Sequence, residues 1–181
     1  MNLEMESIKN IISKGLNKSI DKMNRISSFK WELGNIKFEV SKDNNDCVAI
    51  YLLSKDFNKI AFVLFIKKED ANKIFKIFSG YYPDLSDSYK NSYEIILREV
   101  GNIVLNSVLG EFANLMRIAI IPDLPKVISG EKFFILENIS RIIEENILKI
   151  PISSVIKVKG RDKIMEMELF FFVDNEIIRK I

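Results

Sequence analysis

Two kinds of hydrophobic pattern alternate along the chain. Long segments place an apolar residue every three or four positions, which predicts amphipathic helices, and short continuous apolar runs predict buried strands. Residues 3–24 show the first pattern and are expected to form a helix. Its apolar stripe consists of Met5, Ile8, Ile12, Leu16 and Met23.

The rest of the first half predicts two or three strands and a short helix. The strands are expected at residues 30–41, 47–54 and 58–67. Polar breaks at 42–46 and 55–58 are typical of turns, because Asn, Asp and Lys interrupt the apolar runs there. The helix is expected at residues 67–80, with Gly80 as its end.

The second half begins with the longest helical pattern, at residues 87–116. Its core stripe is expected to contain Leu97, Val100, Val104, Val108 and Leu115. The following segments predict a strand at 117–121, a loop at 122–130, a helix at 131–149 that Pro151 ends, strands at 152–160 and 163–174, and a terminal helix at 175–181.

The order of elements suggests an internal duplication. Each half begins with a long helix and continues through strands to a strand pair and a helix, which gives a period of about 90 residues. We therefore expect one domain, residues 1–181, built from pseudo-repeats 1–85 and 86–181. The expected class is α+β with a central, mainly antiparallel sheet.

Composition limits the functions that are possible. The chain has 181 residues, of which 48% are hydrophobic, so a sizeable core is expected rather than disorder. The net charge is only +2 and the lysines are scattered, which argues against a general nucleic-acid binder. No apolar stretch approaches the roughly 20 residues of a membrane span, and the charged N-terminus is unlike a signal peptide. We expect a cytoplasmic protein without membrane insertion.

The residue inventory removes several kinds of chemistry. The chain contains no histidine and one cysteine, Cys47, so it offers no zinc-ligand set, no internal disulfide and no Ser-His-Asp or Cys-His arrangement. Cys47 lies in a strand-like run, where the role of a small buried hydrophobe is favoured over that of a nucleophile. No metal site is expected.

Polar residues form a stripe on the long helix opposite its core stripe. Glu99, Asn102 and Asn106 follow one another at spacings of three and four, which places them on one face. Gly101 lies between the first two and costs a helix roughly 1 kcal/mol relative to Ala, so a packing or access reason is expected. On the helix alone, an ordinary solvated face is the favoured interpretation of these residues.

The spacing from Glu99 to Pro125 resembles a known signature. Glu99, two residues, Asn102, then twenty-two residues and Pro125 resembles the motif of the CheC/CheX/FliY family of chemotaxis phosphatases. The surrounding sequence, REVGNIVLNSVLGEFANL, adds to the resemblance, which extends over essentially the whole chain. The family places Asp or Ser four residues before the Glu, and here Ile95 occupies that position.

The resemblance implies a fold and a reaction. It implies a layered α/β/α arrangement and hydrolysis of the aspartyl phosphate of a CheY-like response regulator. Asn102 would orient the attacking water, Glu99 would dock on the regulator's active-site lysine, and Pro125 would shape the nearby loop. No cofactor of its own is expected, and Mg²⁺ would be bound by the regulator. Ile95 would weaken activity without abolishing it.

A duplication predicts a second copy of the motif, and that copy is degenerate. Asn10 matches the family Asn, but Ser7 occupies the Glu position and Leu33 stands where the Pro would be. We expect the first half to be non-catalytic.

Two other functions remain open. One is a non-enzymatic binding or scaffold module like the flagellar switch protein FliM, against which the presence of Glu99 and Asn102 argues. That alternative would have a further C-terminal domain, for which no room is expected after Ile181. The other is an adaptor for CheD, a deamidase partner of CheC. A monomer and a homodimer are both compatible with the sequence, and Ile95 could line a docking surface or be covered by the chain.

Overall fold

The computed structural model describes residues 3–27, 29–37, 44–54, 60–79, 89–117, 119–142, 147–150, 153–159 and 164–174. Within them the helices are α1 (Leu3–Ile26), α2 (Lys68–Ser79), α3 (Tyr89–Met116) and α4 (Lys132–Ile142). The strands are β1 (Lys30–Lys37), β2 (Asp46–Leu53), β3 (Ile60–Lys67), β4 (Lys126–Glu131), β5 (Ile147–Ile150), β6 (Ser153–Lys159) and β7 (Ile164–Asp174).

All seven strands belong to one sheet, and every described pair is antiparallel. From edge to edge the order is β1-β6-β7-β3-β2-β4, and β5 pairs with the far end of β7. The first strand of each half pairs with a strand of the other half, β1 with β6 and β4 with β2, while β3 and β7, the last strand of each half, meet at the centre. A duplicated unit that exchanges its first strand would produce this order.

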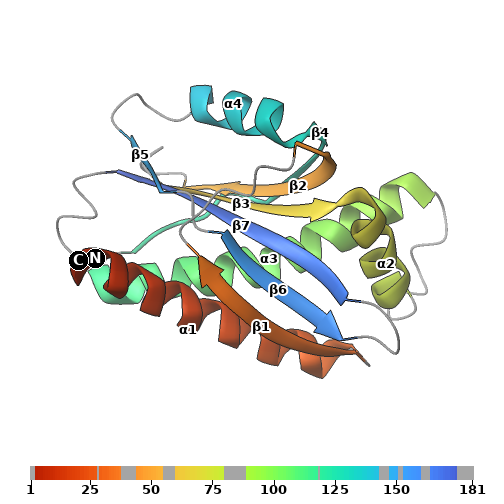
Figure 1. The fold of residues 1–181 in the computed structure, drawn as a ribbon, viewed down its shortest axis with the longest axis horizontal. Coiled ribbons are helices and arrows are strands. Elements are labelled where there is room, and N and C mark those ends of the chain that lie inside the picture. The colour runs from red at the N-terminus through yellow and green to blue at the C-terminus, as the bar shows by residue number, and fades with distance from the viewer. Residues whose placement is uncertain are drawn as a thin grey trace.

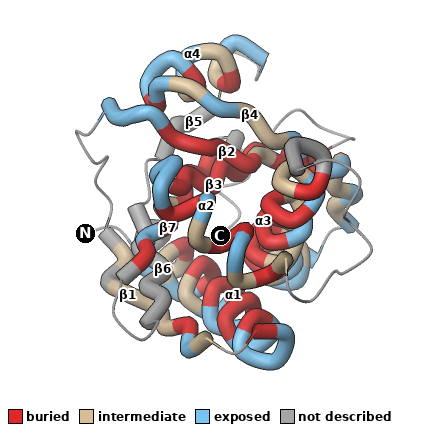
Figure 2. Tube along the Cα trace, turned by 90° about the vertical axis from the view of Figure 1, so that its right-hand side faces the viewer, coloured by how far each residue is buried: buried red, intermediate tan, exposed pale blue. Residues whose placement is uncertain are grey.

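Helices cover both faces of the sheet (Figure 1). The helices α1, α2 and α3 pack on one face, and α4 packs alone on the other, over β2 and β4. Each helix turns a buried side toward the sheet and an exposed side outward (Figure 2). The expected α+β class, with a layered α/β/α arrangement around a mainly antiparallel sheet, is confirmed.

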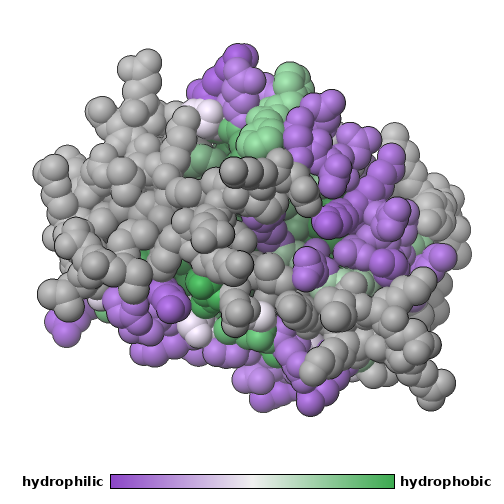
Figure 3. All heavy atoms as spheres, in the orientation of Figure 1, coloured by the Kyte–Doolittle hydropathy of each residue, from purple (hydrophilic) through white to green (hydrophobic). Residues whose placement is uncertain are grey.

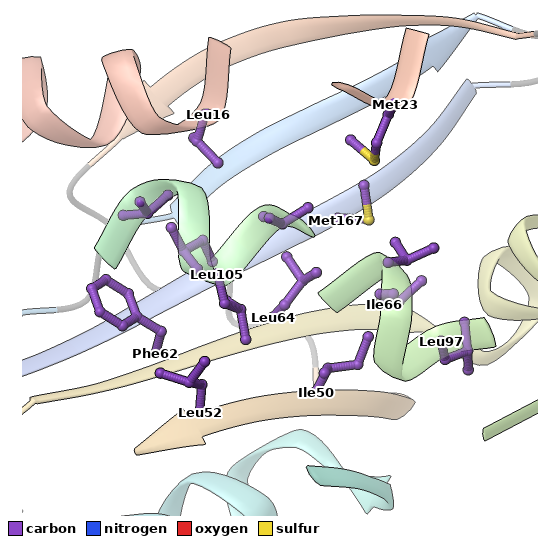
Figure 4. Packing of buried hydrophobic residues seen from close by; sticks show 14 of the residues in the cluster. Leu16, Met23, Ile50, Leu52, Phe62, Leu64, Ile66, Leu97, Leu105 and Met167 are labelled. Atoms are coloured by element: carbon purple, nitrogen blue, oxygen red, sulfur yellow. The ribbon is translucent and has the colours of Figure 1, made fainter. Parts of the chain in front are cut away.

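The main core lies between the sheet and the three-helix layer (Figure 4). Leu16 and Met23 of α1 and Leu97 and Leu105 of α3 are buried there, opposite the alternating residues of β2 and β3. The strand residues on this face are Ile50, Leu52, Phe62, Leu64 and Ile66. Fully burying an aliphatic or aromatic side chain contributes about 1.5–3 kcal/mol each, so this core is the main source of stability.

The helices α1 and α3 run antiparallel and approach each other closely at Gly15. A Cβ placed on Gly15 would lie 2.5 Å from the Cα of Val108. Lys18 forms an ion pair with Glu111, and Lys22 Nζ donates to Ser107 Oγ over 3.2 Å. The partner's number falls by four as the residue number rises by four, which establishes the antiparallel direction.

On the opposite face of the sheet, a buried lysine, Lys132, attaches α4 to β7. Its side chain is buried and forms an ion pair with Glu168, and Nζ lies 4.8 Å from the centre of the Phe170 ring. Buried lysine is rare unless it is paired. The pair and the ring together fix the first turn of α4 against the sheet.

Several expected elements were wrong between residues 115 and 150. Arg117, with a φ of 53°, follows the end of α3, and residues 119–121 are not a strand. The strand is β4, inside the expected loop, because Val127 and Ile128 pair with Ile50 and Ala49 of β2.

The predicted helix at 131–149 was also too long. It ends at Ile142, and β5 follows at Ile147–Ile150, because that apolar run pairs with β7. Leu115, expected in the core, is 48% exposed, since it lies in the last turn of α3. Most of the expected turn at 42–46, the turn at 55–58, the segment 80–88 and the terminal helix at 175–181 lie outside the described residues.

Cys47 is buried, as expected, on the α4 face of the sheet. Its Sγ donates to the Gly130 carbonyl oxygen over 3.5 Å. Burial raises the pKa of the thiol from 9.0 to about 11, and this lowers the thiolate fraction at neutral pH about a hundredfold.

We predict that Cys47 reacts with a thiol reagent at least about a hundredfold more slowly in the native protein than in denaturant, since only the thiolate is nucleophilic. Absorbance on addition of dithionitrobenzoate at pH 7.5, with and without guanidinium chloride, measures both rates. Equal rates would show that the thiol is accessible and that its placement in the core is wrong.

Candidate functional site

Gly101 fixes the rotation of α3 on the sheet. A Cβ on Gly101 would lie 2.2 Å from Cγ2 of Ile50 on β2, so only glycine allows this approach. Gly101 is buried, and its absent side chain makes room for the sheet rather than for an external partner. Of the two reasons considered for this glycine, packing is the correct one.

Glu99 and Asn102 therefore point away from the strand beneath Gly101. Glu99 is exposed, and Asn102 is half-buried rather than fully exposed. Glu99 makes no ion pair with any side chain that the structure describes. The site thus presents an available carboxylate three residues before a partly enclosed carboxamide.

Asn102 faces the flank of α3 that is turned away from α1. Ser107 contacts Lys22 of α1, and Asn102 lies five residues earlier, about 140° around the helix. Because α1 packs on β1 whereas α3 packs on β2, β3 and β4, this flank borders the β4 edge of the sheet.

Pro125 lies at that edge, immediately before β4. Lys126 pairs with Tyr51, and Pro122 bridges Ser54, so three residues, 123–125, oppose two, 52–53. This mismatch is a β-bulge, a position at which proline is tolerated because a ladder hydrogen bond is already interrupted. Pro125 is buried in the segment that leads into β4.

A second asparagine contacts Asn102. Nδ2 of Asn106, one turn later on α3, donates to Oδ1 of Asn102. Arg98, one turn earlier, lies on the same flank and has a buried Nε without a hydrogen-bond partner among the described residues. The sequence pattern placed Asn106 on the polar stripe without a role and did not single out Arg98, although the spacing of four from Asn102 is a usable signal for both.

Ile95 lies one turn before Glu99 and is 39% exposed. The described part of the chain leaves it exposed, and its place in a docking surface stays a prediction. An apolar side chain therefore stands beside Glu99 where the resembled motif has a short polar one.

The first-half positions lie on α1, at the opposite end of the helix pair. Asn10 is exposed and Ser7 is half-buried, and Leu33 is a half-buried residue of β1 that pairs with Ile156. The structure does not bring these residues together with Glu99 and Asn102, because α1 and α3 are antiparallel and cross near Gly15 and Val108.

The described residues contain no group of three or more acidic, Cys or His side chains arranged to hold a metal ion. Nor do they include a helix that is long and apolar enough to cross a membrane.

Comparisons with known proteins agree on the architecture. No family model and no curated protein sequence matches the chain, but solved structures do. FliY of Thermotoga maritima matches with a TM-score of 0.70 and 12% identity over 99% of this chain and 94% of its own.

Two further structures match along nearly their whole length. The FliM middle domain of H. pylori gives a TM-score of 0.61 and 16% identity over 100% of this chain and 99% of its own. CheX of Borrelia burgdorferi, solved in complex with CheY, BeF3 and Mg²⁺, gives 0.53 and 16% identity over 90% and 96%.

This chain has the fold of the CheX, FliY and FliM proteins. At these identities the likeness extends to the fold alone. In this chain α3, the long helix of the second half, packs against a sheet that both halves build, and Glu99 and Asn102 lie on that helix.

The close contact at Gly101 predicts opposite effects for two glycines of α3. Gly101→Ala should lower the free energy of unfolding by about 1 kcal/mol or more, because overpacking costs about 1–3 kcal/mol and exceeds the gain in helix propensity. Gly110 is exposed with no atom within 4 Å of its added Cβ, so Gly110→Ala should stabilise by up to about 1 kcal/mol. Urea denaturation measures both.

Ile50→Ala supplies the control, since it removes the atom that a Cβ at position 101 would meet. In that background Gly101→Ala should no longer destabilise. A stabilising Gly101→Ala in the wild-type background would contradict the close approach of α3 to β2.

Exposure of Ile95 predicts that Ile95→Ser leaves stability within about 0.5 kcal/mol. We also expect Ile95→Ser to speed the loss of phosphate from a CheY-like regulator, because Ser supplies a hydroxyl beside Glu99 where Ile cannot hydrogen-bond. Thermal melts and the rate of phosphoregulator decay test the two parts separately. A large fall in Tm would mean that Ile95 is buried.

Proposed function

We propose that this chain is a phosphatase that hydrolyses the aspartyl phosphate of a CheY-like response regulator. The observation that carries the proposal is the joint presentation of Glu99 and Asn102 on the outer flank of α3, which borders the β4 edge of the sheet where Pro125 lies. The fold of CheX, which was solved with CheY, supports the same partner class.

The proposed reaction needs little from the phosphatase beyond one positioned water. An aspartyl phosphate is already an activated acyl phosphate, and phosphoryl transfer depends mostly on positioning and electrostatic stabilisation. A carboxamide offers a donor and an acceptor and does not titrate, so Asn102 suits the task of holding a water in line. Mg²⁺ on the regulator would carry the developing charge, and no cofactor of this chain takes part.

Glu99 would guide and hold the regulator. Its exposed carboxylate has no described ionic partner, so it can pair with the active-site lysine of a receiver domain. An exposed ion pair contributes modestly and is weakened by salt, so its effect should fall as ionic strength rises. Asn102 therefore provides the chemistry and Glu99 the docking.

Asn102→Ala should remove most of the activity, on the order of a hundredfold in rate, because the attacking water loses its position. The fold should remain, since Asn102 is half-buried at the surface of α3. A timecourse of a ³²P-labelled CheY-like regulator, with wild-type protein, the variant or neither, measures the rate.

Asn10→Ala is the matched control on the first copy of the motif, and it should change the rate much less. Equal losses in the two variants would show that both halves are active. An unchanged decay rate with wild-type protein, with several regulators tried, would overturn the phosphatase assignment.

The alternative is a binding or scaffold module without enzymatic activity, which could include an adaptor for CheD. The likeness to the FliM middle domain favours it, as does a second surface on α4. Phe133 and Phe134 of α4 are 46% and 65% exposed, and Figure 3 shows a hydrophobic patch over that helix. Regulator binding without acceleration of phosphate loss would favour this alternative.

A further inference from the structure

The carboxamide of Asn102 is held by a neighbour that the resembled motif does not include. Nδ2 of Asn106 donates to Oδ1 of Asn102 across one turn of α3. A free asparagine side chain can turn over and exchange its donor with its acceptor, at little energetic cost, because its terminal torsion is broad. The contact with Asn106 selects one orientation, in which Nδ2 of Asn102 points away from Asn106.

We propose that Asn106 is a positioning residue, which sets the orientation of the Asn102 carboxamide for the attacking water. This inference rests on the proposed phosphatase function. A water that accepts a hydrogen from Asn102 Nδ2 keeps a second lone pair for the phosphorus. The new bond joins the water oxygen to phosphorus, the bond from phosphorus to the aspartyl oxygen breaks, and one water proton leaves to solvent. The products are inorganic phosphate and the free carboxylate.

A second observation separates this role from a merely structural one. Oδ1 of Asn106 is buried and has no hydrogen-bond partner among the described residues. A buried acceptor without a partner destabilises the folded state, and an apolar side chain of similar size avoids that cost. Asn106 therefore lowers the stability of the fold relative to an apolar residue, and the atom that can account for its presence is the Nδ2 that contacts Asn102.

The packing around Asn106 restrains its side chain. Leu105 and Leu109, one residue before and three residues after Asn106, are buried, so α3 is tightly packed where Asn106 projects. Asn106 itself is half-buried, which restricts its own rotamers. A restrained donor next to a partly enclosed carboxamide is the arrangement that a positioned water requires.

The test replaces Asn106 and follows turnover separately from regulator binding. Asn106→Leu should lower kcat on the order of tenfold and leave KM for the phosphorylated regulator within about twofold, because binding does not require the orientation of Asn102. Its Tm should stay equal or rise. Asn106→Asp keeps the shape but can only accept a hydrogen, so it should turn the Asn102 carboxamide over and lower kcat in the same way. Asn114→Leu, on an exposed part of α3, is the control and should change neither constant.

A double-mutant comparison and a spectroscopic one complete the test. Asn106→Leu added to Asn102→Ala should cause no further loss, because Asn106 acts through Asn102. The NMR order parameter of the Asn102 side-chain amide should fall in Asn106→Leu.

An active wild type whose kcat is unchanged by both Asn106 variants would overturn this inference and leave the phosphatase function intact. An additive loss in the Asn102→Ala background would also overturn it. An inactive wild type would overturn the proposed function and the inference together.

Discussion

The contact between Gly101 and Ile50 determines which side of α3 meets the sheet. A Cβ at position 101 would lie 2.2 Å from Ile50 Cγ2, closer than atoms of the two elements can approach. A helix that is held at this distance cannot rotate without a clash, because protein interiors are close-packed. Glu99 and Asn102 are placed on the outer flank by this contact, rather than by any interaction of their own side chains with the core.

The strand that carries Ile50 is held on both sides, by one strand from each half of the chain. Ile50 lies on β2, which pairs with β3 of its own half and with β4 of the other half. Val127, its partner on β4, follows the bulge that contains Pro125. The helix and the loop that border the site are therefore fixed to the same strand, although 22 residues separate Asn102 from Pro125 in the chain.

The sequence predicted the parts that local pattern controls. The bounds of α1 and α3, the strands β2 and β3, the core residues of α3 from Leu97 to Val108, and the outward side of Glu99 all follow from periodicity. The class of fold followed from the order of elements.

The features that the sequence did not predict depend on residues that are distant in the chain or on side-chain rotamers. The strands β4 and β5 form because β2 and β7 lie beside them, and no local signal distinguished them from a loop and the end of a helix. The burial of Lys132 depends on Glu168 and Phe170, which are far away in the chain. The contact of Asn106 with Asn102 depends on rotamers that a helix wheel does not supply.

The proposed function requires that the outer flank of α3 is the surface that engages a phosphorylated receiver domain. Side-chain amide NMR of the labelled protein, with a CheY-like regulator added in its BeF3- and Mg²⁺-bound form, tests this claim most directly. We expect the side-chain amide signals of Asn102 and Asn106 to shift and broaden on addition of the activated regulator, and not with the regulator that lacks BeF3 and Mg²⁺. Unchanged side-chain amide signals at both residues, with changes in the same spectra confined to the backbone amides of Phe133 and Phe134 on α4, would contradict it.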